Sequence, residues 1–413
     1  MKILCGYKFR MYPDEEQEQS LRQQGGNARF LWNHFLGENG KKYEEDKKFK
    51  FYGEMVKELL VVKEVYPWLK ESFSQSLQQV LRHLDRAIRD AINSGSKKGY
   101  PVYKKKSNKS DGFVVPQKFR VGKNFIFVPK VGEVKIIKHR EIVGKAKSLT
   151  VSQDGNQWYC SVLVERKVKI EQREVDPVKV VGVDLGIKTY AELSDGESVA
   201  NPKTLKKHEK KLKKLQRQLS RKEKGSNNRA NAKTKLQNEH RRVRNIRLDF
   251  LHKLSHDVII KHDGVVIEDL VVSNMVRNHK LAKSISDCGW GMFKRFLKYK
   301  AEWTGKGYYE VDRWFGSSRT CNKCGWYNHD LTLKDREWVC GGCGMVHDRD
   351  KNAAINIKKY WEVNMDIPVG SGELTPVEIG AKLKSGMVEE LRSFEAGINE
   401  RWIANSTGSG LST

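Results

Sequence analysis

Four cysteines in the C-terminal third of the chain have the spacing of a metal site. Cys321, Cys324, Cys340 and Cys343 form the pattern C-x2-C-x15-C-x2-C. Each C-x-x-C turn can direct two thiolates at one Zn²⁺ ion, and the spacer lies within the usual zinc range. Four reduced structural thiols are the alternative, which fits this spacing less well. Because four thiolates complete a tetrahedral Zn²⁺ shell, we expect this zinc to be structural and the reactive chemistry to lie elsewhere.

Acidic residues at the ends of predicted elements offer that chemistry. Asp184 ends a strand of the buried type, and the pair Glu268-Asp269 ends another. Asp348 and Asp350 follow the last cysteine and precede a helical pattern. Carboxylates that are buried together need cations, and Mg²⁺ takes oxygen ligands from both protein and phosphate. Two Mg²⁺ ions about 4 Å apart would activate water and stabilise a departing 3′-oxygen, so these acids predict phosphodiester hydrolysis.

Each acidic position also has a purely structural interpretation. Asp184 could turn the chain, Glu268-Asp269 could be a solvated strand end, and Asp350 could cap a helix. Within the two pairs, Asp269 competes with Glu268 and Asp348 competes with Asp350 as the metal ligand. The joint occurrence of all three positions with a cysteine motif before the last acid favours the metal site.

The first half of the chain predicts helices and a small β-barrel. An alternating strand, Lys2–Met11, stops at Tyr12-Pro13, where Asp14 can cap a helix. An apolar stripe over Ser74–Asp90 has helical spacing. Short strands follow, two of them joined by Asp154-Gly155, a strong hairpin signal.

The charge of the chain indicates a polyanionic partner. The net charge is +27, and Leu205–Leu254 carries 18 Lys and Arg residues against four acids, in two amphipathic helices with a turn at residues 225–228. Nucleic acid is the expected partner. A coiled-coil surface is the alternative, but acids for charge pairing are scarce. Expected nucleic-acid contacts are Lys210, Lys214, Arg241 and Arg244 here, with Lys104 and Lys105 in a basic linker that also holds two tyrosines.

An anionic membrane is the rival polyanion, but the sequence contains no run of 18 apolar residues and no signal-type N-terminus. Three further isolated cysteines suit a reducing compartment. We therefore expect a cytoplasmic, prokaryotic protein that associates with the nucleoid when bound to DNA. Residues 367–413 hold four basic and six acidic residues, so this tail is not expected to bind nucleic acid.

Between about Lys2 and Tyr360 the chain closely resembles the TnpB family, transposon-encoded RNA-guided nucleases related to type V CRISPR effectors. The motifs that carry the resemblance are Lys8-Phe9-Arg10-Met11-Tyr12-Pro13, Gly26-Asn27-Ala28-Arg29-Phe30, Gly182-Val183-Asp184-Leu185-Gly186-Ile187-Lys188, Val266-Ile267-Glu268-Asp269-Leu270, Ser317-Ser318-Arg319-Thr320-Cys321 and Asp348-Arg349-Asp350-Lys351-Asn352-Ala353-Ala354.

The resemblance implies an RNase H-like (RuvC) nuclease domain whose catalytic and Mg²⁺-binding triad is Asp184, Glu268 and Asp350. It also implies a guide RNA from the transposon end and recognition of a short transposon-adjacent motif in duplex DNA. Both DNA strands would be cut by the single RuvC active site. Sequence would be read by base pairing while protein cations hold the heteroduplex backbone. The RNA complex is expected to be monomeric.

The expected fold class is therefore multidomain, with α/β and β-barrel parts. The predicted divisions are 1–13 (first strand of a wedge domain), 14–98 (helical recognition domain), 99–176 (wedge β-barrel), 177–316 (RuvC nuclease domain, with the basic helical hairpin 205–254), 317–347 (inserted zinc ribbon), 348–366 (final RuvC helix) and 367–413 (flexible C-terminal tail).

Two other classes of function remain open from the sequence. A non-catalytic, RNA-guided DNA-binding regulator would explain the charge and the ribbon but not three acids at the ends of elements. A transposase-type recombinase would share an acidic triad, although no separate domain for binding DNA ends is evident. Cleavage assays separate these classes.

Overall fold

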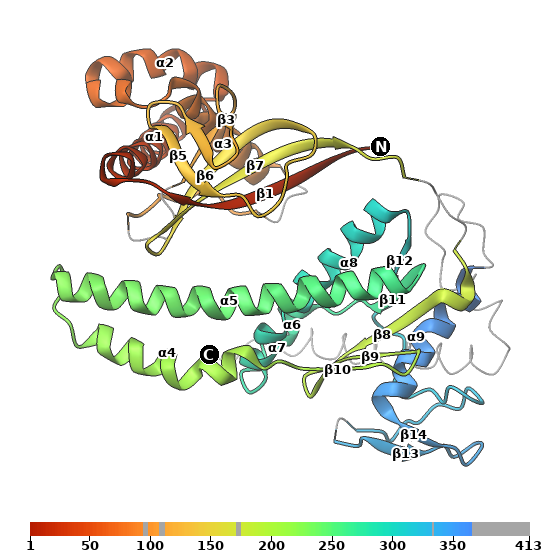
Figure 1. The fold of residues 1–413 in the computed structure, drawn as a ribbon. Coiled ribbons are helices and arrows are strands. Elements are labelled where there is room, and N and C mark those ends of the chain that lie inside the picture. The colour runs from red at the N-terminus through yellow and green to blue at the C-terminus, as the bar shows by residue number, and fades with distance from the viewer. Residues whose placement is uncertain (94–97, 107–111, 171–174, 333, 366–413) are drawn as a thin grey trace, which may run out of the picture. The chain divides into compact units, whose positions relative to one another are not determined.

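The computed structural model describes residues 1–93, 98–106, 112–170, 175–332 and 334–365 (Figure 1). The predicted tail 367–413 lies outside the described residues. The chain forms two compact units. The first contains Met1–Lys169 and Glu209–Arg242, and the second contains the described parts of Ile170–His208 and Val243–Thr413.

A seven-stranded antiparallel sheet forms the centre of the first unit, in the order β2-β6-β7-β1-β5-β4-β3. Strand β1 alternates buried and exposed residues along its whole length, as its sequence predicts, and pairs with β7 and β5. The edge strands β2 and β3 have only three and two residues, so the described sheet is an open half-barrel instead of the predicted barrel. The strands are β1 (Lys2–Tyr12), β2 (Phe113–Val115), β3 (Arg120–Val121), β4 (Phe125–Val128), β5 (Gly132–Ile137), β6 (Lys145–Asp154) and β7 (Gln157–Lys167).

Three helices connect β1 to β2. The Asp14 carboxylate accepts a hydrogen bond from the Gln17 backbone N–H at 2.8 Å, which confirms the predicted cap. The apolar stripe of the third helix, including Leu77, Leu81 and Ile88, is buried. These helices are α1 (Glu15–Asp46), α2 (Tyr52–Val65) and α3 (Ser74–Ile92), with a short 3₁₀ helix at Pro67–Glu71.

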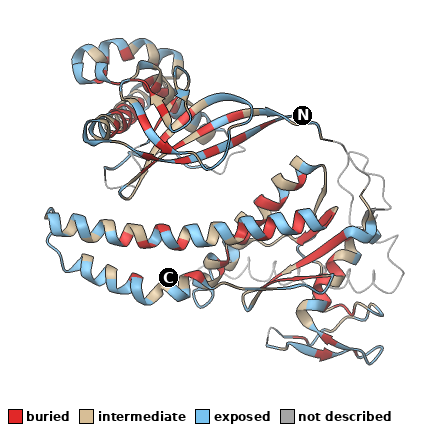
Figure 2. Cartoon of the chain, in the orientation of Figure 1, coloured by how far each residue is buried: buried red, intermediate tan, exposed pale blue. Residues whose placement is uncertain are grey.

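The basic segment of the sequence folds as two helices, α4 (Thr204–Ser220) and α5 (Asn227–Lys261). Their outer parts belong to the first unit, where Lys211 of α4 pairs with Glu239 of α5 at 2.5 Å. Figure 2 shows α4 as largely exposed, whereas strands such as β7 and β8 (Val180–Leu185) carry several buried residues. Helix α4 therefore presents lysines such as Lys210 and Lys214 to solvent.

A five-stranded sheet in the order β10-β9-β8-β11-β12 organises the second unit. Strands β8, β11 and β12 are parallel, while β9 runs antiparallel to β8 and β10. Buried residues such as Val181 and Ile267 pack with α5 and α8 on one face, and Val180 and Val266 pack with α9 on the other. The strands are β8 (Val180–Leu185), β9 (Thr189–Leu193), β10 (Ser198–Ala200), β11 (Gly264–Glu268) and β12 (Gly307–Val311).

Helix α9 lies unusually close to strand β8. A Cβ atom at Gly182 would collide with the backbone of Ala354 and Lys358, so only glycine permits this approach. The remaining elements of the second unit are a 3₁₀ helix at Pro177–Lys179, α6 (Val272–Met275), α7 (Ala282–Cys288), α8 (Trp290–Thr304), the two-stranded sheet of β13 (Glu337–Val339) and β14 (Val346–Asp348), and α9 (Arg349–Met365).

Candidate active site

Two of the predicted acids stand side by side at one edge of the five-stranded sheet. The parallel register pairs Val183 of β8 with Ile267 of β11, so Asp184 and Glu268 are the next residues on the two strands. Both side chains are partly buried. The carboxyl ends of parallel strands meet at one edge, which is where ligands bind in open α/β sheets.

The pKa of Asp184 is shifted by burial and by the charges of the other two predicted acids. Burial raises the pKa of the Asp184 carboxyl well above its ordinary value, and the negative charges of Glu268 and Asp350 raise it further. The nearby Arg349 guanidinium acts in the opposite direction. Burial also raises the pKa of Glu268. Asp184 and Glu268 therefore lie in an environment that disfavours their charged forms unless cations are present, and Asp350 is close enough to Asp184 to contribute to it.

Asp348 and Asp350 have different roles at the start of α9. The Asp348 carboxylate accepts hydrogen bonds from the backbone N–H groups of Asp350 (3.1 Å) and Lys351 (2.9 Å). Asp348 is therefore the N-cap of α9, and its carboxylate is used by the helix. The Asp350 carboxylate binds the guanidinium groups of Arg336 at 2.7 Å and Arg349 at 2.9 Å. The negative charge of Asp350 contributes to the raised pKa of Asp184.

Asp269, like Asp348, is held by other contacts of the fold, whereas its neighbour Glu268 is not held by ion pairs within the part of the chain that the structure describes. Its carboxylate pairs with Lys294 at 3.0 Å and with Arg313 at 2.8 Å. The hydrogen bond from Lys294 is the main reason that the pKa of Asp269 lies below its ordinary value. Asp269 therefore stabilises a local ion-pair network, whereas no cation pairs with Glu268 among the described salt bridges.

Three further residues contact or face these acids in ways that the sequence did not predict. The Ser317 hydroxyl donates to Glu268 Oε1 at 2.5 Å, and Arg336 reaches Asp350 from the short β-ribbon. Glu192, directly opposite Asp184 on β9, is a fourth carboxylate and is buried. Cross-strand and ribbon-to-helix contacts of this kind depend on the tertiary fold, so spacing along the chain could not identify them.

The four predicted cysteines are gathered at one point. The Sγ atoms of Cys321, Cys324, Cys340 and Cys343 all lie within 4.8 Å of one another. Among the described residues this is the one group of possible metal-binding side chains gathered so closely. The Cys324–Cys340 and Cys321–Cys343 sulfur distances are 3.5 and 3.8 Å. A tetrahedral Zn²⁺ ion with Zn–S bonds of about 2.3 Å places its sulfurs about 3.8 Å apart, so the donor set fits zinc.

The local structure of the cysteine turns also suits thiolates. In both turns the residue after the second cysteine is a glycine with positive φ, Gly325 at 82° and Gly344 at 71°. Burial raises the pKa of the Cys340 thiol, but the N–H groups of Cys343 and Gly342 outweigh this effect and bring the pKa to about 7. Buried His347, which the sequence analysis did not single out, has Nε2 3.0 Å from Cys321 Sγ.

The predicted nucleic-acid residues of the linker lie in the first unit. Lys104 Nζ stands 3.7 Å from the centroid of the Trp32 ring, and its backbone N–H donates to Asn33 at 2.8 Å. Desolvation lowers the pKa of Lys104. Lys105 is exposed. The linker is thus fastened to α1, with Lys105 directed to solvent.

The four predicted cations of the helical hairpin differ in exposure. Lys210 and Lys214 are exposed on α4. Arg241 is buried, and its guanidinium donates to the Asp154 carbonyl at 2.7 Å, which ties α5 to the β6–β7 turn. Arg244 is partly buried in the second unit. The two lysines are therefore better placed than Arg241 to reach a phosphate.

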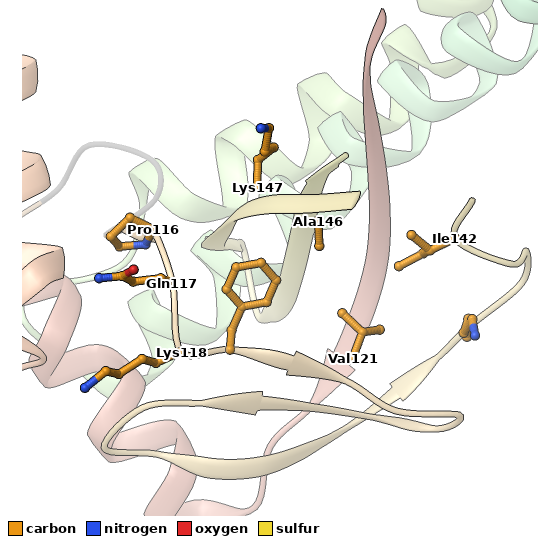
Figure 3. Close-up of a pocket in the computed structure, with 9 residues that line it drawn as sticks. Pro116, Gln117, Lys118, Val121, Ile142, Ala146 and Lys147 are labelled. Atoms are coloured by element: carbon orange, nitrogen blue, oxygen red, sulfur yellow. The ribbon is translucent and has the colours of Figure 1, made fainter. Parts of the chain in front are cut away.

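A cavity of about 480 Å³ lies in the first unit (Figure 3). Lys118, Lys138, Lys147 and Phe119 are among the residues that line it. None of the predicted site residues lines this cavity, so it has no part in the carboxylate site. Within the described residues, no helix is both long and apolar enough to cross a membrane.

Family models match three parts of the chain. Residues 160–279 match a model described as "Probable transposase", and residues 290–357 match one described as "Cas12f1-like, TNB domain". Residues 1–48 match a model described as "Helix-turn-helix domain"; in the structure these residues form β1 and one continuous helix, α1.

Relatives are similar over most of the chain. A protein of Streptomyces pristinaespiralis named "Putative RNA-guided DNA endonuclease" is 36% identical over 363 residues, covering 86% of this chain and 89% of its own length. The corresponding protein InsQ of Escherichia coli K12 is 36% identical over 377 residues, covering 86% and 92%. The fold resembles that of the protein in a Cas12f1–sgRNA–target DNA complex, with a TM-score of 0.53 at 12% identity, covering 86% of this chain and 99% of that one. Because these relatives are 36% identical over most of both chains, the chain belongs to the TnpB family, the family of these proteins named as RNA-guided DNA endonucleases.

Proposed function

We propose that this protein is a transposon-encoded, RNA-guided DNA endonuclease whose active site is formed by Asp184, Glu268 and Asp350. The observation that carries the proposal is the electrostatic convergence of these three acids at one end of the five-stranded sheet. It occurs in a chain whose relatives, 36% identical, are named as endonucleases of this kind. The enzyme would be a hydrolase of phosphodiester bonds.

The strand order supports a RuvC-type nuclease domain. In the order β10-β9-β8-β11-β12, the first strand in sequence lies at the centre and one strand runs antiparallel to its neighbours. This arrangement is the one expected of RNase H-like nucleases. It brings the ends of β8 and β11 together and leaves the third acid to α9, which packs on the same sheet.

The three carboxylates suit a hard cation that also binds phosphate, and Mg²⁺ is the natural choice. Bound there, Mg²⁺ would supply positive charge to activate water and to stabilise the departing 3′-oxygen. Asp184 and Glu268 would hold the metal from the sheet edge and Asp350 from α9. Arg336 and Arg349, which pair with Asp350, would release carboxylate oxygens as the metal charge replaces theirs.

The cations of the chain suit a guide RNA and a heteroduplex. The net charge of +27 on 413 residues is an excess of cations over acids, so internal ion pairs cannot neutralise it and a polyanionic partner can. Exposed Lys105, Lys210 and Lys214 are proposed phosphate contacts. Sequence recognition would come from base pairing between the guide and one DNA strand, after a short adjacent motif in the duplex is recognised. The guide would derive from the transposon end, and the RNA complex would be monomeric.

A test uses the protein purified with the RNA that it retains. That RNA is sequenced, and a plasmid matching its guide segment is incubated with the complex and Mg²⁺. We expect a double-strand cut that needs both the match and the metal. Binding of the matched plasmid without any cut would instead indicate an RNA-guided regulator.

The description "Probable transposase" of the matching family model makes a DNA-joining recombinase the second candidate. The products of the same reaction distinguish it. A recombinase would yield strand-transfer products that join transposon ends to the plasmid, whereas the endonuclease yields linear plasmid with free ends.

A further inference from the structure

A buried polar cluster links the first cysteine turn to the carboxylate site. We propose that Ser317, Asn352 and Asn356 are positioning residues that orient Glu268 for metal binding and couple its orientation to the zinc ribbon. This proposal rests on the proposed function for the role of Glu268. The contacts themselves involve four separate parts of the second unit: the end of β11, the loop before Cys321, the first cysteine turn and α9.

The first link is the hydrogen bond from Ser317 to Glu268. Ser317 is 4% exposed, and its hydroxyl donates to Glu268 Oε1 at 2.5 Å. A donor fixed on one carboxylate oxygen sets the rotation of the carboxyl group and leaves Oε2 to bind a cation. A short, charge-assisted bond of this kind is stronger than a neutral one.

The second link holds Ser317 in place from α9. Asn356 Nδ2 donates to the Ser317 carbonyl at 2.8 Å and to the Thr320 carbonyl at 2.6 Å. Asn352 Nδ2 donates to the Thr320 carbonyl at 2.8 Å, and its Oδ1 accepts from the Asn322 backbone N–H at 2.9 Å. Both amides are almost fully buried. A buried network in which every member is satisfied specifies one geometry.

The third link is the chain itself. Cys321 lies between Thr320 and Asn322, the two residues that Asn352 holds, so a shift of the first cysteine turn moves the acceptors of both amides. Asp350 lies in the first turn of the same helix, two residues before Asn352. Helix α9 therefore carries one proposed metal ligand and, through Ser317, positions a second. When zinc orders the ribbon, the orientation of the Glu268 carboxylate should therefore become fixed as well.

The experiment measures metal binding directly, with Mn²⁺ as a paramagnetic substitute for Mg²⁺ followed by electron paramagnetic resonance on the full-length RNA complex. We expect Ser317→Ala to weaken Mn²⁺ binding about tenfold, since it removes a hydrogen bond to a charged group. Zinc content and guide-RNA binding should stay at wild-type levels. Ser318→Ala, one residue away, is the matched control and should bind Mn²⁺ normally.

Asn356→Ala should weaken Mn²⁺ binding through Ser317, so Ser317→Ala combined with Asn356→Ala should lose less than the sum of the two single effects. Asn364→Ala, in the same helix but with its amide bound to the Tyr360 carbonyl, is the control for loss of a helical amide. Restoration of Mn²⁺ binding by Ser317→Thr would support the role of the hydroxyl.

Normal Mn²⁺ binding by Ser317→Ala would overturn the proposal. It would also be overturned if Asn356→Ala lowered the melting temperature while Mn²⁺ affinity stayed unchanged, because the cluster would then only stabilise the fold. Since the readout is metal binding, a protein that binds Mn²⁺ as expected but cuts no DNA would contradict the proposed function and leave the positioning role supported.

Discussion

The cysteine cluster and the carboxylate site both bring like-charged ligands together, the first from one local ribbon and the second from distant segments of the chain. The four Sγ atoms lie within 4.8 Å of one another, in two similar turns of one small ribbon. The carboxylates come from two strands and a helix, and the oxygens of Asp350 are bound by two arginines. Four thiolates close a tetrahedral shell and suit a structural metal, whereas three carboxylates leave positions for water and phosphate. Ligand type and number would distinguish a stabilising zinc ion from the proposed reactive metal.

The largest effect is expected from breaking the closed site. Cys340→Ser should abolish zinc binding, which contributes on the order of 10 kcal/mol to the folding of small zinc modules. Zinc measured by elemental analysis should fall from one ion per chain to none, and limited proteolysis should cut within 317–347. Cys5→Ala, outside the cluster, should retain one zinc. Zinc-free wild-type protein with an intact ribbon would contradict this assignment.

The carboxylate site should instead be unstable without its metal. The folded-state pKa of Asp184 is raised, so the folded protein binds more protons than the unfolded chain and its stability falls as pH rises through that pKa. Asp184→Asn should therefore stabilise magnesium-free, zinc-loaded protein at neutral pH, because the amide has no charge to bury beside the other carboxylates. Urea unfolding at several pH values measures this. An equally large gain at acidic pH would argue against the electrostatic cause.

A smaller effect, on the salt dependence of RNA binding, is expected to distinguish the exposed cations of the hairpin from the buried one. Replacing Lys210 and Lys214 by alanine should lower the slope of log affinity for RNA against log salt by about 0.7 for each phosphate that the protein no longer neutralises. Arg241→Ala should change that slope less and lower the melting temperature more, because its guanidinium holds the Asp154 carbonyl. Filter binding at several salt concentrations measures the slopes. If Arg241→Ala instead lowered the salt slope more than replacement of Lys210 and Lys214, the RNA contacts would have to be assigned to the face of α5 that carries Arg241.

The sequence predicts this molecule best where chemistry depends on local spacing. The cysteine turns, the Asp14 cap and the Asp154-Gly155 hairpin between β6 and β7 depend on neighbouring residues, and all three are confirmed by the structure. The strand-end positions of Asp184 and Glu268 follow from short apolar runs in the same way.

What the sequence left open depends on contacts between distant segments. That the Asp348 carboxylate caps α9, which favours Asp350 as the proposed metal ligand, is seen only in the folded structure. Arg241 belongs to a basic helix whose pattern indicates a solvated face, yet tertiary packing buries it. Ser317 and Arg336 reach the acids across 49 and 14 residues of sequence, distances over which periodicity carries no information.

The central claim is that Asp184, Glu268 and Asp350 form one DNA-cleaving site while their acidic neighbours do not take part. The most direct measurement is the rate of guide-dependent plasmid cleavage by five single alanine variants. Alanine at any of the three should slow cleavage at least about 10³-fold, equivalent to about 4 kcal/mol of transition-state stabilisation, with RNA binding retained. Asp348→Ala and Asp269→Ala should cost much less, since the first removes a cap worth about 1 kcal/mol. Full activity in Asp184→Ala, or equal losses at Asp348 and Asp350, would contradict the assignment.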